Sequence, residues 1–287
     1  MRPAVRPYDD ELAVLATMHG KERVIHPLLK RALGLHVAVS RDIDTDWFGT
    51  FSRDVERTGT QIDAARAKIS AAFAATPEAT VAIASEGSFG PHPYIPFVPL
   101  AREIVMLADR TRGIEVIGYH ACLETNFSHA VVSNVESALE FASRLQFPKH
   151  GLLVIGCRDG QPAPERVLLK DIADANDLTD AVERVVSICG TAFIETDMRA
   201  HRNPTRMRGI KRATLDLVRR YRSSCPVCAA PGFAVTRRLT GLPCSWCHGP
   251  TDAIRAEVMS CVLCDHRVER PMAAVSADPG SCGQCNP

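Results

Sequence analysis

Apolar runs alternate with helix-like segments along the first two thirds of the chain. The strands expected from the apolar runs cover residues 11–18, 35–40, 80–85, 103–109, 113–123, 150–157, 165–172 and 191–197. Helical spacing of apolar positions predicts helices over residues 19–34, 61–76, 130–147 and 177–190. This alternation is typical of an α/β domain, with helices flanking a largely parallel or mixed sheet.

A further helix is predicted from Asn203, which can cap it, through Pro204 in its first turn and on to residue 222. Residues 199–222 carry nine basic side chains and one acidic one, whereas residues 1–198 carry a net charge of −7 and the remaining tail is neutral. A short basic segment between an acidic domain and a neutral tail favours contact with phosphate, in a small molecule or in a nucleic acid.

The composition is that of an ordinary globular protein, with 46% hydrophobic and 23% charged residues. No apolar stretch approaches the roughly 18 residues of a membrane span, and the first residues lack the pattern of a signal peptide. We therefore expect a soluble, cytoplasmic protein with no membrane partner.

Eight of the eleven cysteines form four C-x-x-C pairs in the tail: Cys225/Cys228, Cys244/Cys247, Cys261/Cys264 and Cys282/Cys285. Such a pair turns two sulfurs toward one point, and two pairs complete a tetrahedral zinc site. We expect a small zinc-ribbon-like module over residues 223–287 with two structural Zn²⁺ ions, after an α/β domain over residues 1–222. A reduced or disulfide-bonded cluster is the alternative, which an intracellular location disfavours. The isolated Cys122, Cys157 and Cys189 are interpreted as small core residues.

Two pairings of the cysteine pairs are open. Sequential pairing, within residues 225–247 and within residues 261–285, uses two spacings that are usual for zinc sites, and we prefer it. Interleaved pairing remains the alternative. His248 and His266 lie close to cysteine pairs and could replace a ligand, but eight thiolates already satisfy two ions.

Acidic residues follow several of the predicted strands. They are Asp44, Asp46, Glu86, Glu124, Glu195 and Asp197. In open α/β sheets ligands bind outside the carboxyl ends of the strands, and carboxylates that meet there repel one another unless a cation compensates. We therefore expect Mg²⁺ or Mn²⁺, with Asp44 and Asp46 as candidate ligands. The alternative is that each acid caps a helix or faces water.

A segment rich in glycine and small residues, 85–93, follows one predicted strand. It offers exposed backbone N–H groups to an anion, although it matches neither the Walker pattern nor G-x-G-x-x-G, and a simple turn is the alternative. We expect Ser85, Ser88 and His92 to bind substrate. Lys21, which follows the first strand, is expected to reach a phosphate.

The densest group of chemically active residues lies at 195–206. It combines two acids, a histidine and two arginines, so that it could bind a metal and an anion while His201 or a carboxylate moves a proton. We predict catalytic roles for Glu86, Glu124, Glu195, Asp197 and His201, and anion binding by Arg199 and Arg206. A network of structural salt bridges would look similar in sequence.

Several segments resemble an uncharacterised bacterial family that is known only as a domain of unknown function. The resemblance rests on ASEGSFGPHP at 84–93, DTDWFGTF at 44–51, ETNF at 124–127, ETDMRAHRNPTRM at 195–207, and CPVCAAPGF with GLPCSWC in the tail. It covers most of the chain and implies an α/β domain with a zinc-binding tail. It assigns no reaction and no catalytic residue.

Two function hypotheses follow. The first is a Mg²⁺- or Mn²⁺-dependent enzyme, a hydrolase or transferase, that acts on a phosphorylated or nucleotide-like small molecule. The second is a non-catalytic module that binds nucleic acid or protein through the arginine-rich helix 203–222 and the zinc tail. We favour the enzyme, because an acidic rim opposes a polyanion and only 6% of the residues are aromatic, which gives little support to stacking on bases.

Overall fold

The computed structural model describes residues 7–40, 59–93 and 95–286. The chain forms two compact units, of which the first combines residues 1–108 with 117–218 and the second combines residues 109–116 with 219–287. The first unit holds two sheets with their helices, and the second holds the cysteine-rich tail. The mixed α/β fold and the cysteine-rich C-terminal module expected from the sequence are confirmed, whereas the division into domains near residue 222 stays a proposal.

The first sheet has the strand order β2-β1-β3-β4-β5. Its strands are β1 (Leu12–Ala16), β2 (His36–Val39), β3 (Val81–Pro91), β4 (Pro99–Asp109) and β5 (Ile114–Cys122). Strand β1 pairs in parallel with both β2 and β3, as the predicted alternation of strands and helices requires. The crossover helices are α1 (Glu22–Leu33) and α2 (Gln61–Ala75).

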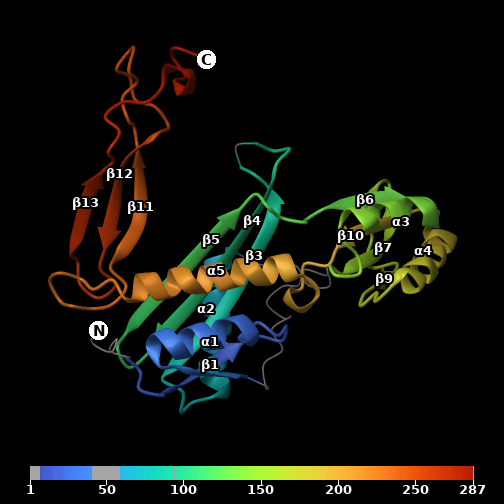
Figure 1. The fold of residues 1–287 in the computed structure, drawn as a ribbon, viewed down its shortest axis with the longest axis horizontal. Coiled ribbons are helices and arrows are strands. Elements are labelled where there is room, and N and C mark those ends of the chain that lie inside the picture. Colours follow the sequence, from blue (N-terminus) through green and yellow to red (C-terminus); the bar gives the residue numbers. More distant parts are fainter. Residues whose placement is uncertain (1–6, 41–58, 94, 287) are drawn as a thin grey trace. The chain divides into compact units, whose positions relative to one another are not determined.

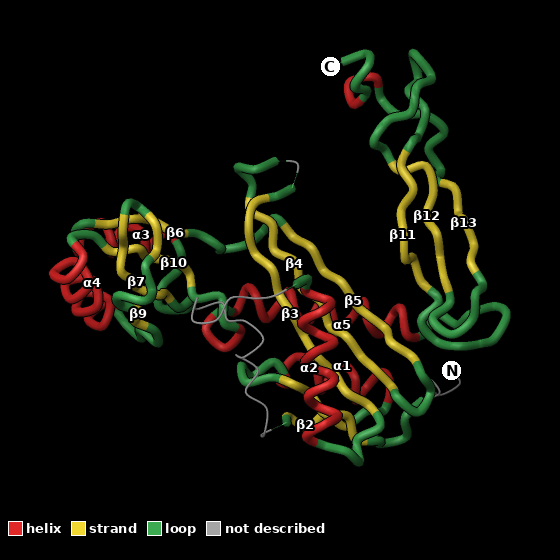
Figure 2. Tube along the Cα trace, turned by 180° about the vertical axis from the view of Figure 1, so that it is seen from behind, coloured by secondary structure: helices red, strands yellow, loops and turns green. Residues whose placement is uncertain are grey.

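The two crossover helices cover opposite faces of this sheet (Figures 1 and 2). From β1 the chain moves to one side to form β2 and returns to the other side to form β3, so two right-handed crossovers must use opposite faces. Helix α2 begins with a capping box between Thr60 and Asp63, and its Ala65, Ile69 and Ala72 belong to the core on its face. Helix α1 ends at Gly34, which has φ 86°.

Strand β3 is longer than the sequence pattern predicts. The apolar run ends near Ser85, but the strand continues to Pro91 and takes in most of the glycine-rich segment. Ser85, Glu86 and Gly87 are buried there. Most of the segment is therefore part of a sheet and not a loop, because β3 pairs with β4, and anion binding by Ser85, Ser88 and His92 stays a prediction.

The second sheet of this unit has the order β6-β10-β7-β8, with β9 beside β7. Its elements are β6 (His129–Val132), α3 (Val135–Arg144), β7 (Leu152–Arg158), β8 (Gln161–Pro162), β9 (Leu168–Leu169), α4 (Ala175–Cys189) and β10 (Ala192–Thr196). Strand β10 is antiparallel to both β6 and β7. Residues 165–172, predicted as a full strand, contribute only the short β9. The expectation of parallel pairing does not extend to this sheet.

Helix α5 (Pro204–Tyr221) lies directly against β5. A Cβ atom on Gly118 of β5 would lie 2.2 Å from the carbonyl oxygen of Ala213 and 2.3 Å from the backbone nitrogen of Leu217. Glycine is therefore required for this close approach of helix to strand. The short helix η2 (Ala200–Arg202) precedes α5, and the side chain of Asn203 accepts from the backbone N–H of Arg206 at the start of α5.

The second unit contains a three-stranded antiparallel sheet in chain order, β11 (Ala234–Thr240), β12 (Ile254–Ser260) and β13 (Arg267–Pro271). The short helix η3 (Pro279–Ser281) precedes the last cysteine pair. Few large apolar side chains are buried in this unit, with Phe233, Leu242 and Val258 among them. A core of this size gives a small module limited stability, so bound metal is expected to contribute.

Candidate functional site

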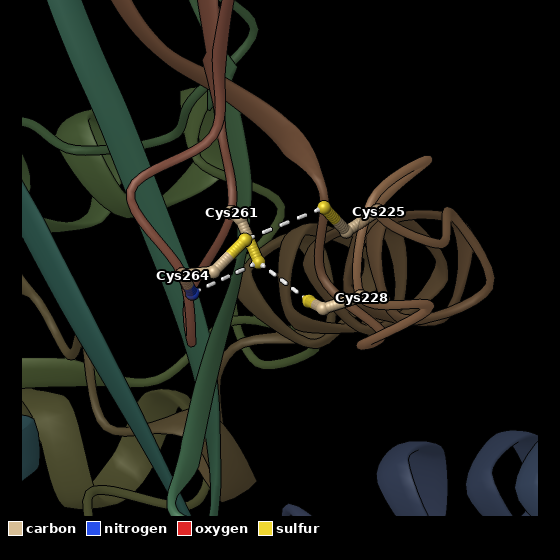
Figure 3. A group of neighbouring side chains, drawn as sticks. All are labelled: Cys225, Cys228, Cys261 and Cys264. Carbon is tan, nitrogen blue, oxygen red and sulfur yellow. Dashed lines mark hydrogen bonds between the residues drawn. The ribbon is translucent and has the colours of Figure 1, made fainter.

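The eight tail cysteines form two groups of four neighbouring sulfur atoms. One group holds Cys225, Cys228, Cys261 and Cys264, and the other holds Cys244, Cys247, Cys282 and Cys285. In the first group, drawn in Figure 3, the sulfurs of Cys225 and Cys264 are 3.8 Å apart and those of Cys228 and Cys261 are 3.5 Å apart. Four sulfurs at about 2.3 Å from a tetrahedral Zn²⁺ are about 3.8 Å from one another, so both groups could hold zinc.

The second group has the same dimensions. The sulfurs of Cys244 and Cys285 are 3.9 Å apart, and those of Cys247 and Cys282 are 3.6 Å apart. These separations are far longer than the roughly 2.05 Å of a disulfide bond, and all eight cysteines are free. The geometry therefore fits four-thiolate metal binding and not the disulfide-bonded alternative.

The pairing of the cysteine pairs is interleaved, so the sequential pairing that we preferred is wrong. Strand direction explains the result. The first pair precedes β11 and the third follows β12, and because these strands are antiparallel the start of β11 lies beside the end of β12. The second pair follows β11 and the fourth follows β13, which both end near the start of β12. One metal group therefore lies at each end of this sheet.

The backbone around the cysteine pairs forms tight turns. The backbone N–H groups of Cys225, Cys244 and Cys261 each donate to the carbonyl oxygen five residues later. Backbone N–H groups of Leu263 and Cys264 also donate to the sulfur of Cys261, which lowers the pKa of that thiol to about 6. Such N–H···S bonds favour the thiolate, the form in which cysteine binds a metal.

A cavity in the first unit has a volume of about 390 Å³. We call it the arginine cavity. It is lined by Phe89, Ala101, Glu103, His120, Cys122, Glu124, Thr125, Asn126, Arg144, Leu145, Gln146, His150, Met198, Thr205, Arg206, Arg208, Gly209 and Arg212. Strand β5 supplies His120 and Cys122, which lie two and four residues beyond Gly118 and so on the same face of the strand.

Part of the lining of the arginine cavity is cationic. Arg208 and Arg212 are one helical turn apart on α5, and Arg144 comes from the end of α3. All three side chains are exposed to solvent. An Nη atom of Arg208 donates to the hydroxyl of Thr205, and Arg144 has a long 3.9 Å contact with Glu140. These guanidinium groups retain the donor capacity to bind an anion.

A buried ion pair also belongs to the lining of the cavity. The Nε atom of Arg206 donates to Oε1 of Glu103 at 2.8 Å, with both side chains almost fully buried, and the guanidinium lies 5.3 Å from the centre of the Phe89 ring. A Cβ on Gly87 would come within 3.0 Å of both Arg206 and Glu103, so this glycine provides room for the pair. Burial raises the pKa of Glu103, and Arg206 opposes that rise.

Three of the predicted residues join a buried charge cluster close to this pair. Lys21 donates from Nζ to the carbonyl oxygen of Ser85 at 2.7 Å, and Lys68 forms a 2.5 Å ion pair with Glu86. Burial, together with the charge of Arg206, lowers the pKa of Lys21 to about 7. Lys21, Ser85 and Glu86 are at most 4% exposed, and they do not belong to the residues that line the arginine cavity.

The predicted residues at 195–201 lie at the end of the second sheet. Asp197 accepts two hydrogen bonds from Nε of Arg199 and one at 2.7 Å from its Nη2, and Arg199 also pairs with Asp171. Glu195 is buried in β10. Arg199 and Asp197 thus form the structural salt bridge that sequence reasoning left as an alternative.

His201 lies in a second, smaller hollow of about 230 Å³, stacked on His19 with ring centres 5.0 Å apart. Burial lowers the pKa of both rings, that of His19 to about 3, with a further contribution from Lys21 at His19 and from Arg199 at His201. Both imidazoles are therefore neutral at physiological pH.

Among the predicted residues, Glu124 and Arg206 are brought together in the lining of the arginine cavity. Ser88 lies in β3, and the backbone N–H of half-buried His92 donates to the carbonyl of Val98 in the β3–β4 connection. Asp44 and Asp46 lie outside the described residues. Within the described chain, the groups of three or more metal-ligating side chains are the two cysteine groups, so the carboxylates placed here do not support the expected Mg²⁺ or Mn²⁺ ion.

Sequence reasoning missed most of the residues that line the arginine cavity. Glu103 could have been identified as a candidate from the sequence, because it is a lone acid at the edge of an apolar run. Arg208 and Arg212 could also have been identified, since their spacing puts both on one face of a helix. His120 and His150 had no local signal, because only the approach of β5, α5 and the α3–β7 connection brings them together.

Comparison with known proteins adds a family but no activity. A search of curated proteins finds no match. No helix in the described chain has the length and apolar character required to span a bilayer. Residues 70–287 match a family, and because this match covers more than half of the chain, the protein belongs to the family described as "Domain of unknown function (DUF6671)".

Proposed function

We propose that this protein binds a small anionic molecule in the arginine cavity and that its tail is stabilised by two structural Zn²⁺ ions. The observation that carries the first part is the charge of the cavity lining. It contains four arginines and two glutamates, and one of those arginines is already neutralised by Glu103. The remaining three arginines against Glu124 favour an anionic ligand.

The size of the cavity supports a small molecule over a polymer. A volume of about 390 Å³ is at the lower end of the range of roughly 300–1,000 Å³ that is usual for small-molecule sites. The basic residues Arg206, Arg208 and Arg212 of α5 all belong to the lining of this cavity. This arrangement favours the small-molecule hypothesis over the nucleic-acid hypothesis.

Zinc binding is carried by the sulfur geometry of the tail. Four thiolates leave no open coordination position, so the ions would have a structural role and would contribute folding free energy to the second unit. Each ion would join two cysteine pairs that are separated by a strand or more of the three-stranded sheet.

Catalysis by this protein stays a proposal. The cavity lining includes groups that can transfer protons, namely Glu103, Glu124, His120 and His150. Burial lowers the pKa of both histidines, with Arg212 adding to the effect at His120 and Lys149 at His150. Neutral imidazoles beside an anion site are suited to accept a proton from a bound substrate.

Binding can be tested with inorganic phosphate and pyrophosphate as probes. We expect both to protect Cys122, which lines the cavity, from alkylation by iodoacetamide, as measured by mass spectrometry. Arg212→Gln should weaken pyrophosphate binding about tenfold in titration calorimetry, because a charge-assisted hydrogen bond contributes about 1.5–3 kcal/mol.

The matched control is Lys211→Gln, which removes the same charge from the neighbouring exposed position outside the cavity lining. Cys189, which is half-buried and outside the cavity, should react at the same rate with and without the probe. Equal losses in the two variants would contradict a specific site. Nucleic-acid binding that weakens steeply with salt, without pyrophosphate binding, would instead support the second hypothesis.

A further inference from the structure

Buried polar atoms on three of the cavity-lining side chains lack a hydrogen-bond partner among the residues that the structure describes. They are Oε2 of Glu103, Nδ2 of Asn126 and Nδ1 of His150. Glu103 and His150 are 2% and 3% exposed. A buried polar atom without a partner is costly, so three of them around one cavity indicate groups that a ligand would satisfy.

The hydrogen-bond network determines which atom of Asn126 remains for a ligand. The backbone N–H of Arg206 can only donate, so the side-chain oxygen of Asn203 faces it at 3.0 Å. The Asn203 amide group then faces Asn126, whose Oδ1 accepts at 3.0 Å. The Nδ2 group of Asn126 is therefore left as a donor.

The other two atoms are also determined by their neighbours. Oε1 of Glu103 accepts from Arg206, which leaves Oε2 as an acceptor. Nε2 of His150 is 2.9 Å from the hydroxyl of Thr205, which leaves Nδ1 as its second polar atom. Glu103 thus has an acceptor left and Asn126 a donor, and both residues line the same cavity as Arg144, Arg208 and Arg212.

On the basis of the proposed function, we propose that the ligand is a nucleoside monophosphate. The phosphate would bind to the cavity arginines, and the base edge would meet Glu103 and Asn126. Every nucleobase presents N–H donors next to carbonyl or ring-nitrogen acceptors, and these groups are the complement of a carboxylate acceptor and an amide donor. A bare phosphate or a sugar phosphate lacks such an edge and would leave both protein atoms without partners.

Calorimetric titration of the full-length protein with AMP, GMP, CMP, UMP and ribose 5-phosphate tests this proposal. We expect at least one nucleotide to bind ten or more times more tightly than ribose 5-phosphate. Asn126→Asp keeps the oxygen that Asn203 contacts but replaces the hydrogen-bond donor with an acceptor. Glu103→Gln replaces an acceptor oxygen with a donor amide group. Both variants should reduce the ratio of nucleotide affinity to ribose 5-phosphate affinity.

The two variants change the charge of the cavity in opposite directions, so a purely electrostatic effect would move phosphate affinity in opposite directions and leave the ratio unchanged. That result would overturn the proposal. Glu103→Gln also removes the charged partner of Arg206, and if it does not fold, Asn126→Asp carries the test. Equal binding of all five compounds would refute the nucleotide while the anion site stands. If nothing binds and Arg212→Gln has no effect, the proposed function fails as well.

Discussion

Lys21 illustrates at the scale of a residue how the protein tolerates buried charge. Its side chain is 4% exposed, its ammonium group donates to the carbonyl of Ser85, and Glu86 and Glu103 provide negative charge nearby. Burial and Arg206 nevertheless dominate, because they lower its pKa from 10.5 to about 7. The sequence shows that this lysine follows a strand, but its contact with Ser85 of β3 is visible only in the folded chain.

The shift makes stability depend on pH. Between about pH 7 and 10.5 the unfolded chain holds a proton on Lys21 that the folded protein has lost, so the free energy of unfolding rises with pH in this window, by at most roughly 1.4 kcal/mol per pH unit. We expect Lys21→Met to remove this contribution in denaturant unfolding at pH 6, 7.5 and 9. The control is Lys211→Met, at an exposed position. Identical slopes for wild type and Lys21→Met would show that Lys21 stays charged.

The contact of α5 with β5 is the element-scale feature on which the arginine cavity depends. Gly118 brings helix and strand together, and beyond it His120 and Cys122 of β5 line the cavity with Arg208 and Arg212 of α5. Both elements were predicted from apolar spacing. Their contact was not predicted, because no local sequence pattern indicates which helix packs against a given strand.

Gly118→Ala should disrupt this contact. The added Cβ would meet backbone atoms at 2.2 and 2.3 Å, which cannot move away as a side chain could, so we expect a loss of about 3 kcal/mol or more in the free energy of unfolding. Pyrophosphate binding should weaken in the same variant, because displacement of α5 moves three cavity arginines. Gly90→Ala in β3 is the control, since its Cβ would meet no atom within 4 Å. Similar stabilities of the two variants would contradict this account.

At the scale of the whole molecule, the chain divides into two compact units with different sources of stability. The first has extended apolar cores against both of its sheets, whereas the second relies on a three-stranded sheet with a tetracysteine group at each end. Because pairing is interleaved, each metal would close a loop through most of the tail, and the two sites would together hold all three strands in register.

Two double variants distinguish interleaved from sequential pairing. Cys228→Ser with Cys261→Ser removes two ligands from one observed group and should leave one zinc per chain after challenge with a chelator. Cys228→Ser with Cys247→Ser damages both groups and should leave none. Elemental analysis of the wild type should give two zinc ions per chain. Sequential pairing would instead leave one zinc ion in Cys228→Ser with Cys247→Ser and none in Cys228→Ser with Cys261→Ser. Zinc near zero in the wild type would refute metal binding.

Features that depend on residues close together in the chain followed from the sequence alone. They include the eight cysteine ligands, the alternation of β1, α1, β2, α2 and β3, and the basic helix α5, because turn geometry and apolar periodicity are local properties. The tertiary structure alone decided the interleaved cysteine pairing, the burial of Lys21 and Glu86, and the arginine cavity. Each of these depends on which distant strands and helices pair and in which direction. The free energy of those contacts comes from surfaces that meet only in the folded chain, so spacing along the sequence does not reveal them.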